Sequence, residues 1–493
     1  MKRSVLTPLI VACALFMENT DSTVIATSLP AIAGDIGVSP IALKLALTSY
    51  MVSLAVFIPI SGWMADRFGA RTVFRLAMVV FMAGSLACGM ANSLEGFVMA
   101  RFLQGMGGAM MVPVGRLVLL RTVPKTELVS ALAYLTIPAL VGPVVGPPLG
   151  GFITTWFNWR WIFLINIPIG IIGVILASIF IENVREEDVA PLDVPGFLLA
   201  GSGLATLMLA FSSGGGHLIS PPLAIGLGGL GVALLGLYLA HSRRVATPVL
   251  KLSLLRINTF RVSVYSGSLF RIGAGAIPFL LPLMLQAGFG MTPAHSGMIT
   301  FVSAVGALFT KTLATRILRR FGFRSVLGFN LVLASAFVAS YGLFTATTPL
   351  AVMLGTLFLG GCLRSMQFTA FNAIAYADIE PKDMSFATSL YAVAQQLSLA
   401  VGVALGAAAL QVSALLRCGQ PDAIAAQDFM PAFLCVGVVS ALGVLLIPSL
   451  APNAGAEMSG HVSRRKVRDS AGDGTARRAT AEAVQQHPRA GEG

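Results

Sequence analysis

Long apolar runs alternate with short polar segments from near residue 6 to near residue 450. Each run has roughly 20 residues, the length that crosses a hydrocarbon core of about 30 Å at 1.5 Å per residue. The pattern predicts an all-α integral membrane protein with fourteen spans. The predicted spans begin near Leu6, Ile41, Thr72, Leu94, Glu127, Trp161, Val194, Pro221, Phe260, Thr292, Arg324, Leu350, Asp383 and Phe429.

Composition agrees with this pattern. Of the 493 residues, 56% are hydrophobic and only 11% are charged, and the mean hydropathy is +0.83. A soluble domain needs a larger polar surface than this composition provides. The five histidines are scattered, and no G-x-x-x-x-G-K-[ST] loop occurs, so the sequence favours neither a membrane-bound enzyme nor an ATP-driven pump. The polar tail is too short for the folded signalling domain of a sensor.

Basic side chains lie in alternate loops, as around Arg67 and Arg75, from His241 to Arg261, and around Arg319. Short loops rich in lysine and arginine stay in the cytoplasm, so both termini are predicted there. Topology and attraction to anionic membrane lipids explain the net charge of +12, and no nucleic-acid partner is needed. The segment from Pro452 to Gly493 is polar and is predicted to be a disordered cytoplasmic tail.

Two segments recur in the same order in both halves. Residues 66–71 (Asp-Arg-Phe-Gly-Ala-Arg) resemble residues 319–324 (Arg-Arg-Phe-Gly-Phe-Arg), and Pro124-Lys125 resembles Pro381-Lys382. The repeat predicts two six-helix bundles around a central site near the bilayer midplane. The expected domains are a first bundle at 1–185, two additional helices and a linker at 186–258, a second bundle at 259–450, and the tail at 451–493.

Two carboxylates occupy the first apolar run. An acid at the centre of a span costs about 2.5 to 3.5 kcal/mol on insertion scales, so Glu18 and Asp21 need a functional reason. Proton handling is the interpretation we favour. Asp21 lies about eight residues from the outer end of its span and Arg101 about six from the outer end of the fourth. That is a depth difference of about 3 Å at 1.5 Å per residue, so the two side chains can meet.

Three motifs accompany these charges. The first is a loop at residues 62–71, which contains Gly62, Asp66, Arg67, Gly69 and Arg71. The second is Arg101-Phe-Leu-Gln104-Gly-Met-Gly in the fourth span. The third is a Gly/Pro-rich run in the fifth span with Gly142, Pro143, Gly146, Pro147, Gly150 and Gly151. Glycines allow close helix contact and prolines bend helices, so the third motif predicts a hinge and seal, or more simply a packing seam.

These motifs resemble signatures of the major facilitator superfamily, and specifically of its fourteen-span drug/proton antiporters (EmrB/QacA type). The loop is similar to G-x-x-x-D-R-x-G-R-[RK], except that Ala70 replaces a basic residue. The fifth span matches the pattern G-x-x-x-G-P-x-x-G-G. Residues 20–30 are similar to L-D-x-T-x-V-N-x-A-L-P, with Thr20 and Ala26 as departures. Residues 363–369 and 113–116 resemble the HsrA-type branch.

The resemblance implies a proton-coupled antiporter that exports small organic compounds or drugs by alternating access. It implies no cofactor beyond the proton gradient. Asp21, Glu18 and Arg101 would carry proton coupling, with the arginine acting electrostatically because it keeps its proton. The loop and the Gly/Pro-rich residues would gate the conformational change. The expected location is the bacterial inner membrane. A monomer is expected, acting alone or with a periplasmic adaptor and an outer-membrane channel.

Polar residues within the spans are candidates for the substrate cavity. They are Gln104, Arg271, Arg364, Gln367, Asn372, Gln395 and Gln396. Two interpretations of Arg271 and Arg364 stay open. They pair with Glu18 or Asp21 across the cavity, which we slightly favour because an unpaired buried charge is costly, or they bind an anionic substrate. The second interpretation corresponds to an alternative function, the proton-coupled export of an endogenous, anionic metabolite rather than a drug.

Overall fold

A computed structural model describes residues 3–122, 128–183, 189, 191–212, 220–245, 247–380, 383–421 and 423–456. All regular structure in these residues is helical. The first part contains α1 (Arg3–Ile36), α2 (Lys44–Phe68), α3 (Ala70–Met90), α4 (Leu94–Thr122), α5 (Leu128–Trp156), α6 (Trp161–Leu164), α7 (Asn166–Phe180), α8 (Val194–Ser212) and α9 (Pro221–Ser242). The second contains α10 (Asn258–Leu283), α11 (Pro293–Phe321), α12 (Phe323–Ser340), α13 (Leu350–Ile374), α14 (Met384–Cys418) and α15 (Phe429–Leu442).

Short helical turns also occur in the described residues, at Leu252–Arg256, Met284–Gly288, Tyr341–Leu343, Ala426–Asp428 and Gly443–Ser449. Each predicted span has a helix that begins within three residues of the predicted start, because the apolar length of a span is a local property. The predicted tail from residue 457 onward, Pro124-Lys125 and Pro381-Lys382 lie outside the described residues.

Twelve helices in the described part of the chain are long and apolar enough to cross a membrane. One of the twelve is the continuous segment Trp161–Phe180, which α6 and α7 form together. Helices α10 and α14 each count as one span. The other two predicted spans coincide with α5 and α8. The apolar part of α8, Val194–Ala210, is shorter than the rest. The structure therefore supports twelve spans, and fourteen stays a prediction.

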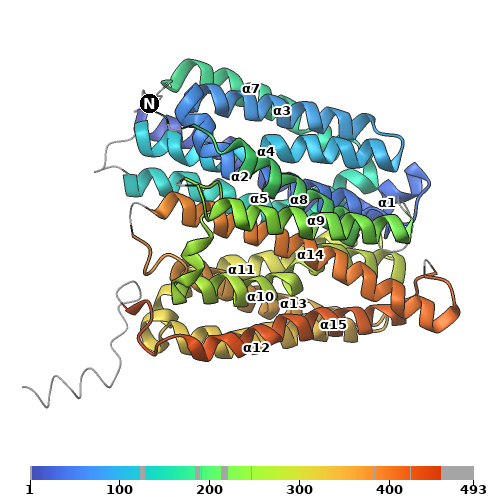
Figure 1. The fold of residues 1–493 in the computed structure, drawn as a ribbon. Coiled ribbons are helices and arrows are strands. Elements are labelled where there is room, and N and C mark those ends of the chain that lie inside the picture. The colour runs from blue at the N-terminus through green and yellow to red at the C-terminus, as the bar shows by residue number, and fades with distance from the viewer. Residues whose placement is uncertain are drawn as a thin grey trace, which may run out of the picture.

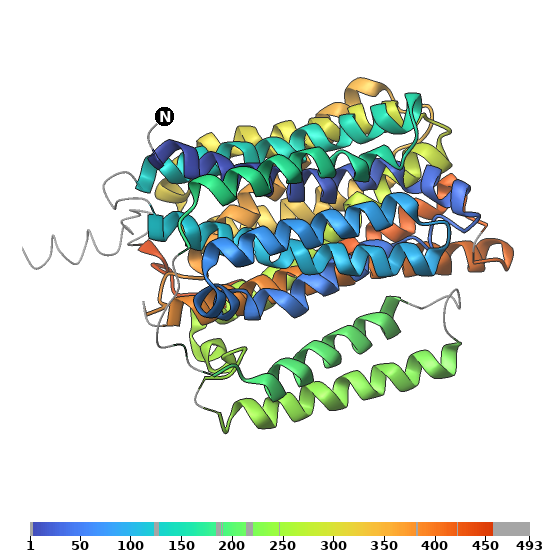
Figure 2. The ribbon, with the colours of Figure 1, turned by 90° about the horizontal axis from the view of Figure 1, so that it is seen from above.

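The helices form two groups that lie side by side (Figure 1). In the first, α1 packs on α5 and α4 packs on both α2 and α3. In the second, α10 packs on α14, α11 on α13, and α12 on α15. The main contacts between the groups are α5 with α11 and α2 with α14. The additional helices α8 and α9 pack on each other, and α8 touches α2 and α14; the pair stands to one side of the bundle in Figure 2.

The two groups share one apolar core at the end of the molecule far from the N-terminus. That core joins Ile41 and Phe97 of the first group to Phe279, Leu285 and Phe429 of the second. At the opposite end each group has a separate core, one around Phe74 and the other around Phe371. A further core joins Ala55 of α2 and Ala200 of α8 to Phe260 and Tyr391 of the second group, so the groups also meet beside the additional helices.

The repeated loops have the same geometry in both halves. Gly69 separates α2 from α3 with φ of 90°, and Gly322 separates α11 from α12 with φ of 74°. A positive φ is easily adopted only by glycine, so each Phe-Gly pair ends one helix and starts the next within a single residue. A Cβ on Gly69 would also lie 2.3 Å from Oδ1 of Asn183.

Candidate functional site

Asp21 of α1 and Arg101 of α4 form an ion pair in the interior of the first group. Nη1 of Arg101 donates to Oδ2 of Asp21 at 2.6 Å, and both side chains are 1% exposed. Two opposite charges at the same depth offset much of the cost of burying each one alone. The depth argument from the sequence leads to this contact.

Amides complete the shell of the carboxylate. Oδ1 of Asp21 accepts from Nε2 of Gln104 at 2.8 Å and from Nδ2 of Asn166 at 3.0 Å. Both amides also donate to the hydroxyl oxygen of Ser85, at 2.8 and 3.2 Å. Hydrogen bonds therefore link side chains from α1, α3, α4 and α7 around one acid. We call this set of residues the Asp21 network: Asp21, Arg101, Gln104, Asn166 and Ser85.

Arg101 is held by more than the ion pair. Its Nη1 also donates to Oε1 of Gln104, and its guanidinium carbon lies 4.3 Å from the centroid of the Tyr50 ring. An arginine over an aromatic face gains a cation–π attraction. The cation thus keeps favourable contacts even when the carboxylate is neutralised.

Glu18 lies outside the Asp21 network. It is half-buried and its Oε1 accepts from the hydroxyl of Tyr50 at 3.3 Å. Tyr50 therefore lies between the two acids, with its hydroxyl on Glu18 and its ring on Arg101.

Close helix contacts hold α4 in place. A Cβ on Gly105 would lie 2.7 Å from the carbonyl oxygen of Tyr50 in α2, and one on Gly107 would lie 2.5 Å from the amide nitrogen of Phe81 in α3. Only glycine fits at either position. The two glycines of the Arg-x-x-Gln-Gly-x-Gly motif therefore bring α4 against α2 and α3, which fixes where Arg101 and Gln104 sit.

The Gly/Pro-rich run of α5 forms a ladder of contacts with α1. A Cβ on Gly146 would lie 2.0 Å from Oγ1 of Thr23, and one on Gly150 would lie 2.5 Å from the carbonyl oxygen of Val24. Gly142 packs in the same way against Thr20, at 3.0 Å. Such close approach is typical of small-residue helix interfaces in membranes.

The same run also reaches the second group. A Cβ on Gly151 would lie 2.4 Å from the carbonyl oxygen of Pro293 in α11, and one on Gly297 of α11 would lie 2.3 Å from that of Pro147. The side chain of Pro143 lies outside the described residues. Helix α5 therefore connects α1 to the other group through backbone contacts.

The loop motif is only partly a packing device. Nη1 of Arg71 donates to the carbonyl oxygen of Ile181 at 3.2 Å, which ties the start of α3 to the end of α7. Arg67 is exposed and Asp66 is half-buried. A glycine in a membrane helix often allows another helix to approach closely, but a Cβ on Gly62 would meet no described atom within 4 Å, so Gly62 does not act in this way. The helices are simply farther apart at that point than the motif suggests.

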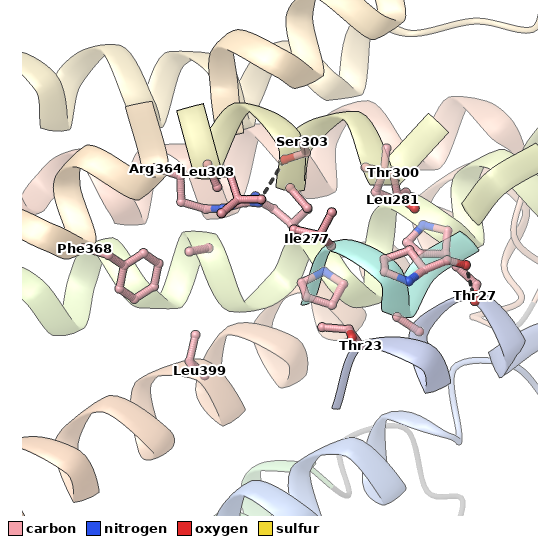
Figure 3. A pocket seen from close by; sticks show the side chains of 18 of the residues that line it. Thr23, Thr27, Ile277, Leu281, Thr300, Ser303, Leu308, Arg364, Phe368 and Leu399 are labelled. Atoms are coloured by element: carbon pink, nitrogen blue, oxygen red, sulfur yellow. Dashed lines mark hydrogen bonds between the residues drawn. The ribbon is translucent and has the colours of Figure 1, made fainter. Parts of the chain in front are cut away.

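A cavity of about 290 Å³ lies between the two groups (Figure 3). Helices α1 and α5 contribute small side chains to its wall. The rest comes from α10, α11, α13 and α14. The lining residues are Thr23, Ala26, Thr27, Val144, Pro147, Ala274, Ile277, Pro278, Leu281, Pro282, Thr300, Ser303, Ala304, Ala307, Leu308, Lys311, Arg364, Phe368 and Leu399.

Two cations line this cavity, and both are held by hydroxyl groups. Nη2 of Arg364 donates to Oγ of Ser303 at 2.9 Å, as Figure 3 shows, and Nζ of Lys311 donates to Oγ1 of Thr369 at 2.8 Å. No residue in the described lining is acidic.

Arg364 is the one predicted cavity residue that the described lining contains. Gln104 belongs to the Asp21 network, and the fully buried Gln367 bonds to Asn330 and to the backbone of α12. Asn372 is exposed, whereas Gln395 and Gln396 are partly buried away from the lining. The difference arises because a residue's depth follows from the sequence, whereas the direction in which it points depends on how each helix is rotated.

Arg271 also lies outside the lining. Its side chain is fully buried in α10, where Nη2 donates to the hydroxyl of Tyr391 and the guanidinium carbon lies 4.6 Å from the Tyr391 ring centroid. Its Nε and Nη1 have no hydrogen-bond partner among the described residues. Neither Arg271 nor Arg364 pairs with Glu18 or Asp21 in the described part of the chain, and Asp21 pairs with Arg101 instead.

Sequence reasoning missed Asn166, Ser85, Tyr50 and Lys311. Asn166 and Lys311 carried a usable signal, because each is a strongly polar residue inside an apolar run. Ser85 and Tyr50 carried none, since serines and tyrosines are common in spans and their partners lie on other helices.

Comparison with known proteins adds to this picture. The Major Facilitator Superfamily matches the chain over residues 11–241 and 263–485. The chain is 37% identical over 460 residues to the "Putative multidrug resistance protein MdtD" of Klebsiella pneumoniae subsp. pneumoniae, with 93% of this chain and 97% of that protein covered. It is 36% identical over the same length to the protein of that name in Salmonella dublin, with the same coverage.

Solved structures are similar in fold. A D-xylose-proton symporter superposes with a TM-score of 0.66 at 14% identity, covering 91% of this chain and 98% of the other. The nucleoside transporter NupG superposes with a TM-score of 0.64 at 11% identity, covering 91% and 100%.

Proposed function

This chain belongs to the major facilitator superfamily, and we propose that it is a proton-coupled antiporter that exports small organic compounds from the cytoplasm. The observation that carries the proposal is the Asp21 network, a buried acid paired with Arg101 and facing two amides. A titratable group inside a membrane protein is by default a functional one. The similarity to proteins named as multidrug resistance proteins supports export of small compounds.

Helix α1 links the proton site to the cavity. Successive residues turn by about 100° on an α-helix, so Asp21 and Thr23 differ by about 200° and face opposite sides. Asp21 contacts α4 and α7, whereas Thr23 lines the cavity and packs on Gly146 of α5. Neutralising Asp21 weakens its hold on Arg101, which frees α1 to move relative to α4 and so changes the cavity wall.

The cycle follows from this link. In the outward-facing state Asp21, and in our proposal Glu18 as well, takes a proton from the periplasm while substrate leaves. The two groups then rock, and the proton escapes to the cytoplasm when new substrate binds. The proton gradient supplies about 1.4 kcal/mol per pH unit and the membrane potential about 2.3 kcal/mol per 100 mV for each charge moved.

Gating belongs to the contacts between the groups. We propose that the α5 ladder and its contacts with α11 form the hinge. The Arg71 contact and the loop that contains Asp66 and Arg67 would lie at the cytoplasmic end. With both termini in the cytoplasm, the shared apolar core closes the periplasmic end. The structure then corresponds to an inward-facing state.

The remaining features follow the sequence predictions. We propose fourteen spans, with α5 and α8 added to the twelve, arranged as two six-helix bundles at 1–185 and 259–450, with the additional pair between them in the sequence. The location is the bacterial inner membrane. The protein is a lipid-embedded monomer, and whether it joins a periplasmic adaptor and an outer-membrane channel is tested by co-purification from crosslinked cells.

Everted membrane vesicles test the function directly. Vesicles that contain the protein and are energised by respiration should lose part of their pH gradient when a transported compound is added. Asp21→Asn should abolish this loss, whereas Asp35→Asn, which changes an acid at the far end of α1, should preserve it. Exchange that survives Asp21→Asn would show that the coupling assignment is wrong.

A further inference from the structure

We propose that the cavity binds a small organic anion with an apolar body, and that Arg364 and Lys311 hold its acidic group. The inference rests on the proposed function and names the substrate class. It extends the site to Lys311 and to a buried cation, Arg271.

The described lining of the cavity has two positive side chains and no negative one. Arg364 and Lys311 line it from adjacent helices, and each donates to a neutral hydroxyl rather than to a carboxylate. No lining residue among those described is acidic. Arg364 is half-buried, and a partly desolvated positive charge in a membrane protein is costly unless an opposite charge lies near it. A bound anion supplies that opposite charge.

Arg271 is a further cation near the cavity, and two of its N–H groups have no described partner. It is fully buried, and its Nε and Nη1 have no hydrogen-bond partner among the described residues. Its guanidinium carbon lies 5.9 Å from the centroid of the Phe368 ring, and Phe368 itself lines the cavity. Ala274, one turn along α10, lines it too. The Phe368 ring thus lies between Arg271 and the cavity. A rotation of that ring would let the Arg271 guanidinium contact a bound anion.

The rest of the cavity defines the body of the ligand. Ile277, Leu281, Leu308 and Leu399 are among the apolar side chains of the wall, so the part of the ligand beyond its acidic group is apolar. A volume of about 290 Å³ lies just below the usual range for ligand sites, which runs from about 300 to 1,000 Å³. The fitting ligand is a compact carboxylate or sulfonate with one or two rings, or an aliphatic chain of similar bulk.

All charged residues of the described lining come from the second group, whereas the Asp21 network belongs to the first. Proton and substrate therefore need not compete for one carboxylate. An antiporter that exchanges one outgoing monoanion for one incoming proton moves two positive charges inward per cycle. Exchange of a neutral compound moves one charge, and exchange of a monocation moves none.

Binding to the purified full-length protein in detergent tests the proposal. The probes are a panel of aromatic and aliphatic carboxylates, each compared with its amide and its ammonium analogue; 1-naphthoate, 1-naphthamide and 1-naphthylmethylammonium form one such set. Isothermal titration should show that carboxylates bind at least tenfold more tightly than their analogues. Arg364→Gln and Lys311→Gln should each weaken carboxylates at least tenfold and leave the amides unchanged.

Arg320→Gln is the matched control, because it removes an exposed cation from α11, the helix that carries Lys311, but outside the cavity. It should bind carboxylates as the wild-type protein does. Arg271→Gln should weaken carboxylates less than Arg364→Gln does. The proposal is overturned if no carboxylate binds, if the ammonium analogues bind as tightly, or if Arg320→Gln weakens binding as much as Arg364→Gln.

A second measurement separates this proposal from the proposed function. Proteoliposomes that exchange a carboxylate for protons should carry two charges per cycle, as measured from the membrane potential that stops net flux. Asp21→Asn should still bind the carboxylate but release no proton. If ammonium compounds are exchanged for protons in an Asp21-dependent way, antiport stands and the anion proposal fails. If carboxylates bind but no proton moves, the anion proposal stands and proton antiport fails.

Discussion

Asp21 and Thr23 lie two residues apart on α1 and contact different parts of the molecule. The carboxylate of Asp21 accepts hydrogen bonds from Arg101, Gln104 and Asn166, whereas Thr23 packs on Gly146 of α5 and lines the cavity. One helix therefore has a charged face toward its own group and a small-residue face toward the cavity. A change in the charge of Asp21 can be transmitted to the cavity over less than one helical turn.

The Asp21–Arg101 pair should behave as a coupled unit in stability measurements. Asp21→Asn and Arg101→Gln each leave one buried charge without its partner, at a cost of about 3 to 5 kcal/mol. The double substitution should cost clearly less than the sum of the two single ones. Unfolding of the purified protein in detergent measures the three values.

The exposed ion pair of Asp35 and Arg160 is the control for this comparison of single and double substitutions. Their ion pair is 2.5 Å long, but the side chain of Asp35 is 44% exposed. Water screens exposed pairs, so Asp35→Asn should change stability by less than about 1 kcal/mol. Additive effects of Asp21→Asn and Arg101→Gln would contradict the importance we give to their contact.

Glycines in the two gating motifs should differ in their tolerance of alanine. A Cβ on Gly150 would lie 2.5 Å from the carbonyl oxygen of Val24, so Gly150→Ala must push α5 away from α1. Overpacking of this kind costs about 1 to 3 kcal/mol, and transport should fall sharply. Gly62→Ala meets no described atom within 4 Å and should leave both thermal stability and transport near the wild-type level. Equal loss of transport in both variants would mean that packing does not explain the motifs.

Gln286 should stabilise the closed end of the molecule. It lies in a π-helical turn, Met284–Gly288, at the end of α10, and its Nε2 donates to the carbonyl oxygen of Thr27 in α1 at 2.8 Å. Gln286→Leu removes this bond between the groups, which is worth about 1 kcal/mol, so the population open at that end should rise about fivefold. Distances between spin labels on the two groups measure the change.

Ser335→Ala is the matched control for Gln286→Leu. It also removes a buried hydrogen bond, 2.8 Å long, but the partner, Ser440, lies in the same group. The distance distribution between the groups should therefore match that of the wild-type protein. A similar shift in both variants would assign the effect to general destabilisation.

The native cysteines allow a test of orientation. Cys418 is exposed at the end of α14, in a loop predicted to face the periplasm, whereas Cys13, Cys88, Cys362 and Cys435 lie within helices and are less exposed. A membrane-impermeant maleimide added to whole cells should label the wild-type protein and not Cys418→Ser. If Cys418 is labelled in everted vesicles but not in whole cells, the predicted topology is wrong.

Much of the fold could be predicted because membrane spans are defined locally. Every predicted span start lies within three residues of a helix start, since apolar length decides where a helix crosses the bilayer. The contact between Asp21 and Arg101 was also predictable, because two residues on neighbouring spans must lie at similar depth to meet. The Phe-Gly loops followed from a repeat visible in the chain.

The lateral arrangement was not predictable in this way. Gln104, Gln367 and Arg271 have the right depth for the cavity, but helix rotation turns them into the interior of one group. Lys311, Asn166 and Ser85 acquire their roles only from partners on other helices. Hydropathy along the chain predicts where the helices begin and how deep each charge lies, because it acts along the membrane normal. Which side chains meet depends on packing between helices, because packing sets the rotation of each helix and its neighbours.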